Sequence, residues 1–420
     1  MRLKSAAVLM LRKLITSKPP LLKMRDLHLG RILNKKLDEE VIDVKKSAKK
    51  QSKDMQEIRK YFAASNFDEE LDKLPPRIVK QRKSKPEHLY LLDHKTADEI
   101  TDLIKDDLIK NSNNIIQVNP GTGVLTERLL AAGIPSITLM EPSIKLIRVL
   151  ALLQTIYVDR LTIREADLLN VWKLAYLDKQ DDGGRLATLF SSFPHAVWGD
   201  DIGLQIIAAV TNGNFIRQII LDVVRQCGLA SYGRPCLYLF ITPVLWTQMT
   251  CGRDGSLNEY RGSSALFQLL FDYKLLGQVS RKAFLPWTPT SVVKKDTDSA
   301  KKSRLHSEYM YVVKIEGKKN LLTELIDVER IRPLWYFINH HMVARTGRII
   351  PQLEVWEPGC GPRLIKQGFN IFTQFGDLSP YELLELFKEF SSWDGYQNSF
   401  IPAMENFELT ILNYRWNRKV

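Results

Sequence analysis

The most informative part of this chain is a ten-residue segment with two glycines, Gln117-Val118-Asn119-Pro120-Gly121-Thr122-Gly123-Val124-Leu125-Thr126. Apolar residues 115–118 predict a short buried strand, and residues 124–132 predict a helix that follows the glycines. A strand, a glycine turn and a helix bring backbone N–H groups and a positive helix end close to a ligand. Gly121 and Gly123 can adopt positive φ, so the backbone approaches that ligand without a Cβ in the way. An ordinary turn that binds nothing is the alternative.

A carboxylate stands where a nucleoside pocket needs one. Residues 136–140 predict a second strand, and Glu141 follows that strand directly. A carboxylate only accepts hydrogen bonds, so it suits the hydroxyl groups of a ribose. The glycine turn and this acid together predict a nucleoside-binding pocket.

Strands and helices alternate around this turn. Helices are predicted at residues 96–109, 124–132, 143–155 and 215–227, and strands at 115–118, 136–140, 161–165, 204–210, 236–241 and 309–315. This alternation predicts an α/β protein with a doubly wound, mostly parallel sheet. Residues 170–203 are predicted to be an irregular insertion, and the polar stretch 288–304 a mobile loop.

The composition is that of a soluble globular protein. The chain has 420 residues, 45% of them hydrophobic and 26% charged, which allows one large domain with an appendage or two domains. No apolar stretch reaches the about 18 uncharged residues of a membrane span, so none is expected. The four cysteines show no Cys-x-x-Cys spacing, so neither a zinc site nor a disulfide framework is predicted.

The net charge of +12 lies almost entirely in the first part of the chain. Residues 1–90 hold 23 Lys and Arg against 12 Asp and Glu, whereas the remaining residues hold 37 against 36. The folded core is therefore nearly neutral, and any surface that binds nucleic acid must be a local patch.

The first residues predict a mitochondrial targeting peptide. Residues 1–25 contain seven Lys and Arg and no acid, with apolar residues interleaved at a spacing that allows an amphipathic helix. We assign residues 1–36 to this peptide, and the alternative is a basic surface helix that remains on the mature protein. The charge-dense residues 37–87 predict a solvated extension.

Residues 321–420 are predicted to form a separate helical lobe. Ser379-Pro380-Tyr381-Glu382 has the hydroxyl cap, the proline and the glutamate of a helix start. Residues 354–362 resemble a second glycine loop, but no helical pattern follows them, so we predict a turn. The seven histidines are scattered and are predicted to be structural or surface residues, with His340 and His341 facing opposite ways.

Asn119 to Thr126, Glu141 and the segment Arg164-Glu165-Ala166-Asp167 together resemble the rRNA adenine dimethylase family. Members of this family use S-adenosylmethionine to dimethylate adjacent adenines in a small-subunit rRNA hairpin. The resemblance covers about residues 88–320 and implies a Rossmann-like methyltransferase fold followed by a C-terminal helical lobe. Asn119 stands where most members have glycine, as in a mitochondrial branch of the family.

The resemblance also implies a cofactor pocket for S-adenosylmethionine made of Leu91, Asn119, Gly121, Gly123, Glu141 and Asp167. Leu91 contacts the cofactor through its backbone, Glu141 accepts from the ribose, and Asp167 accepts from the adenine amine. The segment 89–93 departs from the Gln-Asn-Phe of the family.

The catalytic loop departs further from the family, which ends its fourth strand in Asn-Leu-Pro-Tyr. Aligning residues 204–208 with that strand places Ala209, Val210, Thr211 and Asn212 in the loop, so the asparagine, the proline and the aromatic ring are gone. A rival placement at residues 192–195 lacks a preceding buried strand. Methyl transfer needs the target amine aimed at the methyl group. We therefore expect activity to be weak or absent and the cofactor to be vestigial.

The resemblance implies a protein of the mitochondrial matrix nucleoid that acts as a transcription initiation factor. It would bind the single-subunit mitochondrial RNA polymerase and help it to melt promoter DNA. The candidate phosphate contacts, which are equally well a solvated loop, are Lys294, Lys295, Lys301, Lys302 and Arg304. The alternatives are an active dimethylase of small-subunit rRNA and an assembly factor that binds rRNA without chemistry.

Overall fold

The computed structural model of the chain describes residues 56–63, 68–79, 86–111, 114–199, 201–255, 259–287, 308–394, 396 and 401. The chain divides into two compact units, residues 1–61 and residues 62–420, and the fold described below belongs to the second. The predicted targeting peptide and the five basic residues between 294 and 304 lie outside the described residues. The predicted domain boundaries stay predictions.

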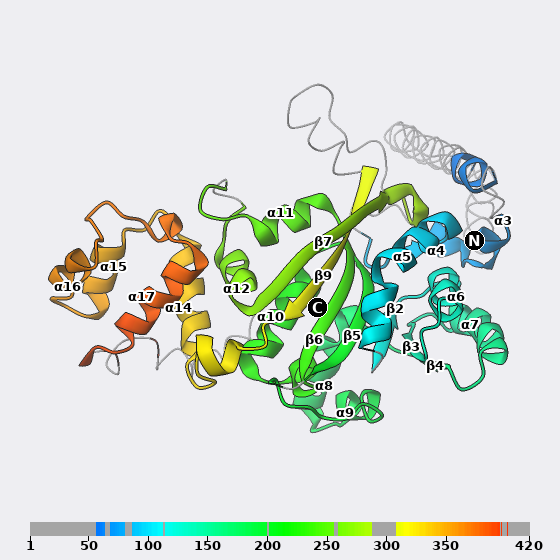
Figure 1. Cartoon of the computed structure of the whole chain (residues 1–420), viewed down its shortest axis with the longest axis horizontal. Helices are drawn as coiled ribbons and strands as arrows, with labels where there is room; N and C mark the ends of the chain where they lie inside the picture. Colours follow the sequence, from blue (N-terminus) through cyan, green and yellow to red (C-terminus); the bar gives the residue numbers. More distant parts are fainter. Residues whose placement is uncertain are drawn as a thin grey trace, which may run out of the picture. The chain divides into compact units, whose positions relative to one another are not determined.

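A seven-stranded sheet organises residues 62–420 (Figure 1). Its strands are β2 (Ile115–Val118), β3 (Ile137–Met140), β4 (Leu161–Arg164), β5 (Ile202–Val210), β6 (Arg234–Ile241), β7 (Phe271–Ser280) and β9 (Tyr309–Gly317). They lie in the order β4-β3-β2-β5-β6-β9-β7. The first five strands are parallel, and β9 runs antiparallel to both β6 and β7. The predicted doubly wound, mostly parallel sheet is confirmed.

Both faces of the sheet are buried. Successive side chains of a strand point to opposite faces, so each central strand contributes to two hydrophobic cores. In β5, Leu204, Ile206 and Ala208 belong to one hydrophobic core, and Ile207 and Ala209 belong to the other. A strand that is buried on both faces has a continuous apolar sequence, which is why β5 was recognisable without polar alternation.

Helices cover each face of the sheet. The second core cluster, which contains Ile207, is completed by α5 (His94–Lys110), α6 (Val124–Ala131) and α7 (Ile144–Ile156). The first, which contains Ile206, is completed by α10 (Asn214–Arg225), α11 (Pro243–Thr250) and α12 (Gly262–Leu270). Two short helices, α3 (Asp68–Lys73) and α4 (Pro76–Val79), precede a two-stranded antiparallel sheet of β1 (Tyr90–Leu91) and β8 (Phe284–Leu285).

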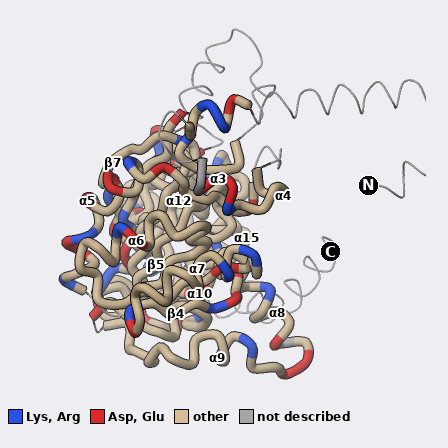
Figure 2. The backbone as a smooth tube through the Cα atoms, turned by 90° about the vertical axis from the view of Figure 1, so that its right-hand side faces the viewer, with Lys and Arg blue, Asp and Glu red and all other residues tan. Residues whose placement is uncertain are grey.

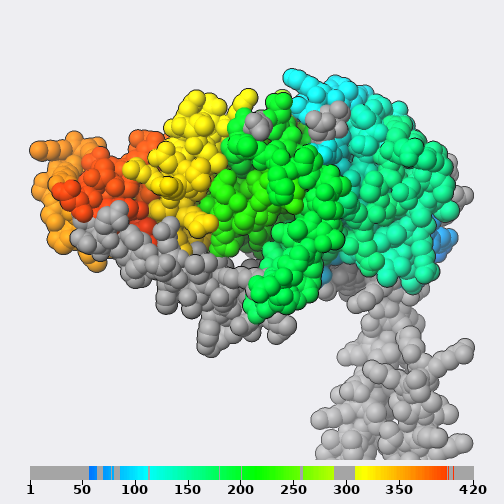
Figure 3. Space-filling view, turned by 90° about the horizontal axis from the view of Figure 1, so that it is seen from below, coloured from blue at the N-terminus to red at the C-terminus, as the bar shows by residue number. Residues whose placement is uncertain are grey.

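The helices after the sheet are α14 (Ile331–Val343), α15 (Ile349–Trp356), α16 (Gly361–Lys366) and α17 (Pro380–Phe390). Figure 3 shows them, yellow to red, beside the green residues of the sheet domain. Phe337 and Phe387 belong to the same core cluster as α10 and α12, so these helices pack continuously on the sheet domain. The predicted start of α17 is confirmed, because Ser379 Oγ accepts from the N–H of Glu382 at 3.3 Å and Glu382 Oε2 accepts from the N–H of Ser379 at 2.7 Å.

Two local predictions are wrong. The segment 170–203 is not irregular, because it contains α8 (Trp172–Asp181) and α9 (Arg185–Leu189). These helices lie on the surface, so they lack the apolar periodicity that would reveal them, and Arg185 joins them by pairing with Asp178 and Asp181. Residues 354–362 were predicted to have no helix after them, but α16 begins at Gly361, inside this segment.

The turn predicted for residues 354–362 is confirmed only for residues 357–360, because residues 354–356 belong to α15 and residues 361–362 to α16. The carboxylate of Glu354 accepts from the N–H groups of Gly359 and Gly361 at 2.7 and 2.6 Å. A side chain of the protein therefore already occupies the position where these N–H groups would bind an anion.

Charged residues of both signs are interspersed over the face shown in Figure 2. Of the helices in the described part of the chain, none has the length and apolar character that crossing a bilayer requires.

Candidate functional site

Asn119, Gly121, Gly123, Glu141 and Asp167 of the predicted cofactor pocket gather just beyond the carboxyl ends of β2, β3 and β4, and β5 ends beside them. The chain builds β2, β3 and β4 outward and then returns to place β5 on the other side of β2, so the strand order reverses between β2 and β5. Open α/β sheets bind ligands in the crevice at such a reversal. The N–H of Asn119 donates to the Met140 carbonyl at 2.9 Å, and the N–H of Glu141 donates to the Arg164 carbonyl at 3.1 Å. These bonds continue the sheet pairing by one residue, so Asn119 and Glu141 are fixed beside the ends of the neighbouring strands.

The turn after β2 has left-handed backbone at three positions. Asn119, Gly121 and Gly123 have φ of 51°, 67° and 92°. Asparagine is among the few residues other than glycine that adopt this conformation readily, which explains how Asn119 can stand where the family has glycine. A Cβ on Gly121 would lie 3.0 Å from Tyr90 Cδ1, so this position needs glycine for space as well as for its dihedral angles.

Glu141 is a fully buried carboxylate at the end of β3, with 0% of its surface exposed. Its Oε2 accepts from the N–H of Gly121 at 3.4 Å, and its Oε1 accepts from the N–H of Ser143 at 3.0 Å. Burial raises the pKa of Glu141 to about 7, and these two N–H groups oppose the rise. The side chain can therefore accept hydrogen bonds from a ligand beside the turn at neutral pH and above.

Asp167 lies beyond β4 and pairs with a residue that the sequence did not single out. Its Oδ2 is 3.1 Å from His88 Nε2 and accepts from Asn170 Nδ2 at 2.8 Å. Burial disfavours the charged form of Asp167, but the bonds from His88 and Asn170 outweigh it and lower the pKa of the carboxyl group. For His88, burial opposes protonation, but the bond to Asp167 and the nearby acids raise its pKa. The pair therefore keeps Asp167 ionised.

Several polar atoms around the turn are buried without a partner. Both side-chain amide atoms of Asn119, Thr122 Oγ1 and Asp167 Oδ1 have no hydrogen-bond partner among the residues that the structure describes. Leaving a buried polar group unpaired costs about 1–3 kcal/mol. Donors and acceptors of a bound ligand can satisfy these atoms, so the residues present fit a polar ligand such as a nucleoside.

The segment before α5 contributes two residues that the sequence analysis did not single out. Leu91 lies in β1 opposite Phe284, and its side chain belongs to the core. Tyr90, the preceding residue, is the one whose ring packs on Gly121. His88 and Tyr90 were missed because their contacts join segments far apart in sequence; the only signal was their place beside Leu91. The role of Leu91 stays a prediction.

Of the four residues predicted to form the loop, Ala209 and Val210 are instead the last residues of β5, paired with Phe240 and Ile241, and only Thr211 and Asn212 follow the strand at this edge. Ala208 is opposite Val118, so the end of β5 lies beside the turn after β2. Thr211 Oγ1 donates to the carbonyl of Pro86 at 2.6 Å, and Asn212 Oδ1 accepts from the N–H of Asn214 at 2.9 Å. Both polar side chains of the loop thus bind their own chain.

In the rival segment 192–195, Ser192 Oγ accepts from Nη2 of Arg164, the last residue of β4, at 2.7 Å, but the following residues lead to the amino end of the sheet. Phe193 is buried in the core, and the ring of His195 stacks on Tyr232 with 4.7 Å between centroids. Tyr232 precedes β6, at the amino end of the parallel strands. No buried strand leads into the segment, because residues 185–189 form α9.

The profile of the "Ribosomal RNA adenine dimethylase" family matches residues 79–359. The chain is 31% identical over 377 residues to "Dimethyladenosine transferase 2, mitochondrial" of Drosophila melanogaster, covering 80% of this chain and 83% of that protein.

Two solved structures are also similar. A dimethyladenosine transferase from Plasmodium falciparum is 12% identical, with a TM-score of 0.44 over 69% of this chain and 95% of that one. The 23S rRNA methyltransferase ErmE is 15% identical, with a TM-score of 0.41 over 71% of this chain and 98% of that one.

Glu141→Gln tests whether the buried carboxylate is kept for a ligand. The raised pKa means that the stability contributed by protonated Glu141 is complete below its ordinary value of 4.5 and is lost as the pH rises through about 7. We expect the neutral variant to be more stable than the unchanged chain at about pH 8, by up to about 3 kcal/mol, and equally stable at about pH 4. Urea unfolding at both pH values measures this. The exposed Glu165→Gln is the control, and lower stability of Glu141→Gln at both pH values would show a purely structural carboxylate.

Asn119→Gly removes the unpartnered amide but keeps the left-handed backbone. Because glycine adopts this conformation without strain, we expect stability within about 1 kcal/mol of the unchanged chain. If the amide faces the ligand, affinity for S-adenosylmethionine falls about three- to tenfold, as for one lost hydrogen bond. Titration calorimetry and thermal unfolding measure the two quantities.

The matched control for Asn119→Gly is Asn114→Gly, which has φ of 52° at the other end of β2 and donates to the Gly203 carbonyl at 2.9 Å. We expect it to lose stability and to keep its affinity. Equal affinity of the Asn119 variant and the unchanged chain would remove Asn119 from the pocket.

Proposed function

The chain belongs to the ribosomal RNA adenine dimethylase family, and on that premise we propose that it is a mitochondrial transcription initiation factor in which methyl transfer is weak or lost. The family depends on S-adenosylmethionine. The proposed location, the mitochondrial matrix and its nucleoid, is supported by the name of the Drosophila relative and by the basic amphipathic pattern of residues 1–36.

The observation that carries the loss of methyl transfer is the loop after β5. A dimethylase must hold the target amine with acceptors and stack the flipped base on a ring. Ala209 and Val210 are buried apolar side chains, Thr211 is bound to Pro86, and Asn212 caps the start of α10. None of these four side chains is placed to hold an amine or to stack on a base.

For the pocket beside that loop we propose the roles that the family implies. Glu141 accepts from the ribose hydroxyls, Asp167 accepts from the adenine amine, and the backbone of Leu91 and the turn from Asn119 to Gly123 line the rest. The unpartnered atoms of Asn119 and Asp167 support this assignment, because such a ligand carries both donors and acceptors. When bound, the cofactor supplies an activated methyl group; His88 keeps Asp167 charged as an acceptor.

The proposed partners are the mitochondrial RNA polymerase and promoter DNA. Their support is the family resemblance together with the degenerate loop, which leaves a nucleic-acid-binding fold free for a task without chemistry. The proposed phosphate contacts of Lys294, Lys295, Lys301, Lys302 and Arg304 belong to the part of the chain outside the described residues.

The second candidate is an active dimethylase of small-subunit rRNA, and the retained pocket favours it. Glu141 and Asp167 keep their carboxylates beside the left-handed turn, where burial of Glu141 and the unpartnered polar atoms costs stability that a bound ligand would recover. Small-subunit rRNA is then the substrate.

Asp167→Ala separates the two candidates. As an initiation factor, the variant should support promoter-dependent RNA synthesis by the mitochondrial polymerase as well as the unchanged chain, since no step of melting uses the cofactor. Run-off transcription measures this, and the exposed Asp106→Ala is the control. In the same case, transfer of labelled methyl groups from S-adenosylmethionine to an rRNA hairpin should stay at background for both the unchanged chain and the variant. Methyl transfer by the unchanged chain that Asp167→Ala abolishes, with no effect of either protein on transcription, would establish the dimethylase instead.

A further inference from the structure

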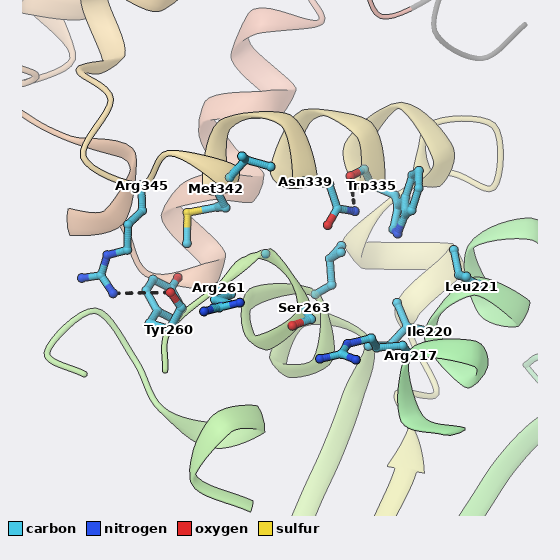
Figure 4. Close-up of a pocket in the computed structure, with 13 residues that line it drawn as sticks. Arg217, Ile220, Leu221, Tyr260, Arg261, Ser263, Trp335, Asn339, Met342 and Arg345 are labelled. Carbon is cyan, nitrogen blue, oxygen red and sulfur yellow. Dashed lines mark hydrogen bonds between the residues drawn. The ribbon is translucent and has the colours of Figure 1, made fainter. Parts of the chain in front are cut away.

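A cavity of about 580 Å³ lies between α10, α12 and α14, outside the pocket described above. Figure 4 shows Trp335, Asn339 and Met342 of α14 on one side of it, and residues of α10 and the start of α12 on the other. Its size falls within the range of about 300–1,000 Å³ that is usual for small-ligand sites. We call it the arginine–tryptophan cavity, after Arg217, Arg261 and Trp335 in its lining.

The cavity begins close to the degenerate loop. Arg217 lies on the first turn of α10, four residues after Gly213, which follows the loop directly. The carbon atom of its guanidinium group is 3.7 Å from the position that a Cβ on Gly213 would occupy. Arg217 is therefore both a lining residue of the arginine–tryptophan cavity and a neighbour of Gly213 at the end of the loop.

One part of the lining is suited to a phosphate group. Arg217 and Arg261 are exposed, and no acidic residue is among the thirteen residues that line the cavity. Gly262 and Ser263, the first residues of α12, lie beside Arg261, and the positive end of a helix favours an anion. Guanidinium groups bind phosphate oxygens in pairs of hydrogen bonds.

The other part is suited to a flat ring with polar edges. Trp335 is half-buried, and Ile220 and Met342 are buried apolar neighbours in the lining. Asn339 Nδ2 donates to the Trp335 carbonyl at 2.9 Å, which turns the amide so that Oδ1 lies towards α12. A Cβ on Gly262 would lie 3.1 Å from this Oδ1, so glycine leaves room around the acceptor.

Arg345 has a structural part in the lining. Its guanidinium carbon lies 5.6 Å from the centroid of the Tyr260 ring, and its Nη1 donates to the Tyr260 carbonyl at 3.4 Å. It adds positive charge to the cavity while it fixes the segment that leads into α12.

We propose that the arginine–tryptophan cavity binds one nucleotide of a single strand, with the phosphate at Arg217 and Arg261 and the base stacked on Trp335. Asn339 Oδ1 accepts from an amino group of that base. A single strand is required, because the bases of a duplex are stacked on one another and cannot turn out to stack on Trp335. The inference rests on the proposed function in so far as that function needs an open strand.

Binding of a fluorescent single-stranded oligonucleotide, prepared both as DNA and as RNA, tests the proposal by anisotropy. We expect Trp335→Ala to weaken binding about fivefold to a hundredfold, as for one lost base stack. The double variant Arg217→Ala, Arg261→Ala should also lower the slope of log affinity against log salt by about 0.7, the value for one phosphate on a single strand. Binding of DNA and RNA to a similar degree supports recognition of the nucleotide and not of its sugar.

The matched control is Arg332→Ala, which changes the same charge on the exposed face of α14, where Arg332 donates to the Arg225 carbonyl at 3.3 Å. It should bind as the unchanged chain does, and thermal unfolding checks that every variant is folded. Quenching of tryptophan fluorescence by the oligonucleotide should be smaller in Trp335→Phe, a change that conserves the packing.

The proposal is overturned if Trp335→Ala and the double arginine variant, both folded, bind each oligonucleotide as tightly as Arg332→Ala does. It is also overturned if the unchanged chain binds neither strand. In either case run-off transcription by the unchanged chain decides separately whether the proposed function stands, so the two failures are distinguishable.

Discussion

The left-handed turn after β2 is the constraint on which the rest of the site depends. Positive φ at Asn119, Gly121 and Gly123 bends the chain sharply from the strand into α6. This bend brings the N–H of Gly121 to the buried Glu141 and lets the ring of Tyr90 pack on the backbone. The arrangement has a cost, because it leaves polar atoms of Asn119 and Thr122 buried without partners. A chain keeps such a cost where a ligand repays it.

The two parts of the carboxyl edge of the sheet, the ends of β3 and β4 and the end of β5, differ in their chemistry. At the ends of β3 and β4, Glu141 and Asp167 keep acceptors in place, and His88 holds Asp167 ionised. After the end of β5, Thr211 donates to the Pro86 carbonyl and Asn212 accepts from the N–H of Asn214. Beyond that loop the chain continues into α10, where Arg217 begins a basic and aromatic cavity. One edge of the sheet thus joins the buried acceptors Glu141 and Asp167, the residues that follow β5, and the start of the arginine–tryptophan cavity.

Local sequence patterns made much of the fold and part of the site predictable. The strand, turn and helix around Gly121, the position of Glu141 and the capped start of α17 follow from short-range rules on periodicity, glycine and capping. Contacts between distant segments did not follow. His88 pairs with Asp167 across 79 positions, and the cavity combines three helices that are separate in sequence. The helices α8 and α9 were missed because exposed helices show no apolar stripe.

The most direct test of the account is methyl transfer by a chain whose loop is restored, with Ala209→Asn, Val210→Leu, Thr211→Pro and Asn212→Tyr together. Labelled methyl from S-adenosylmethionine is followed onto an rRNA hairpin, beside the unchanged chain. If the pocket persists and only the loop has been lost, the restored chain transfers methyl groups well above the unchanged one. Equal transfer by the two chains, with the unchanged chain clearly active, would contradict the account.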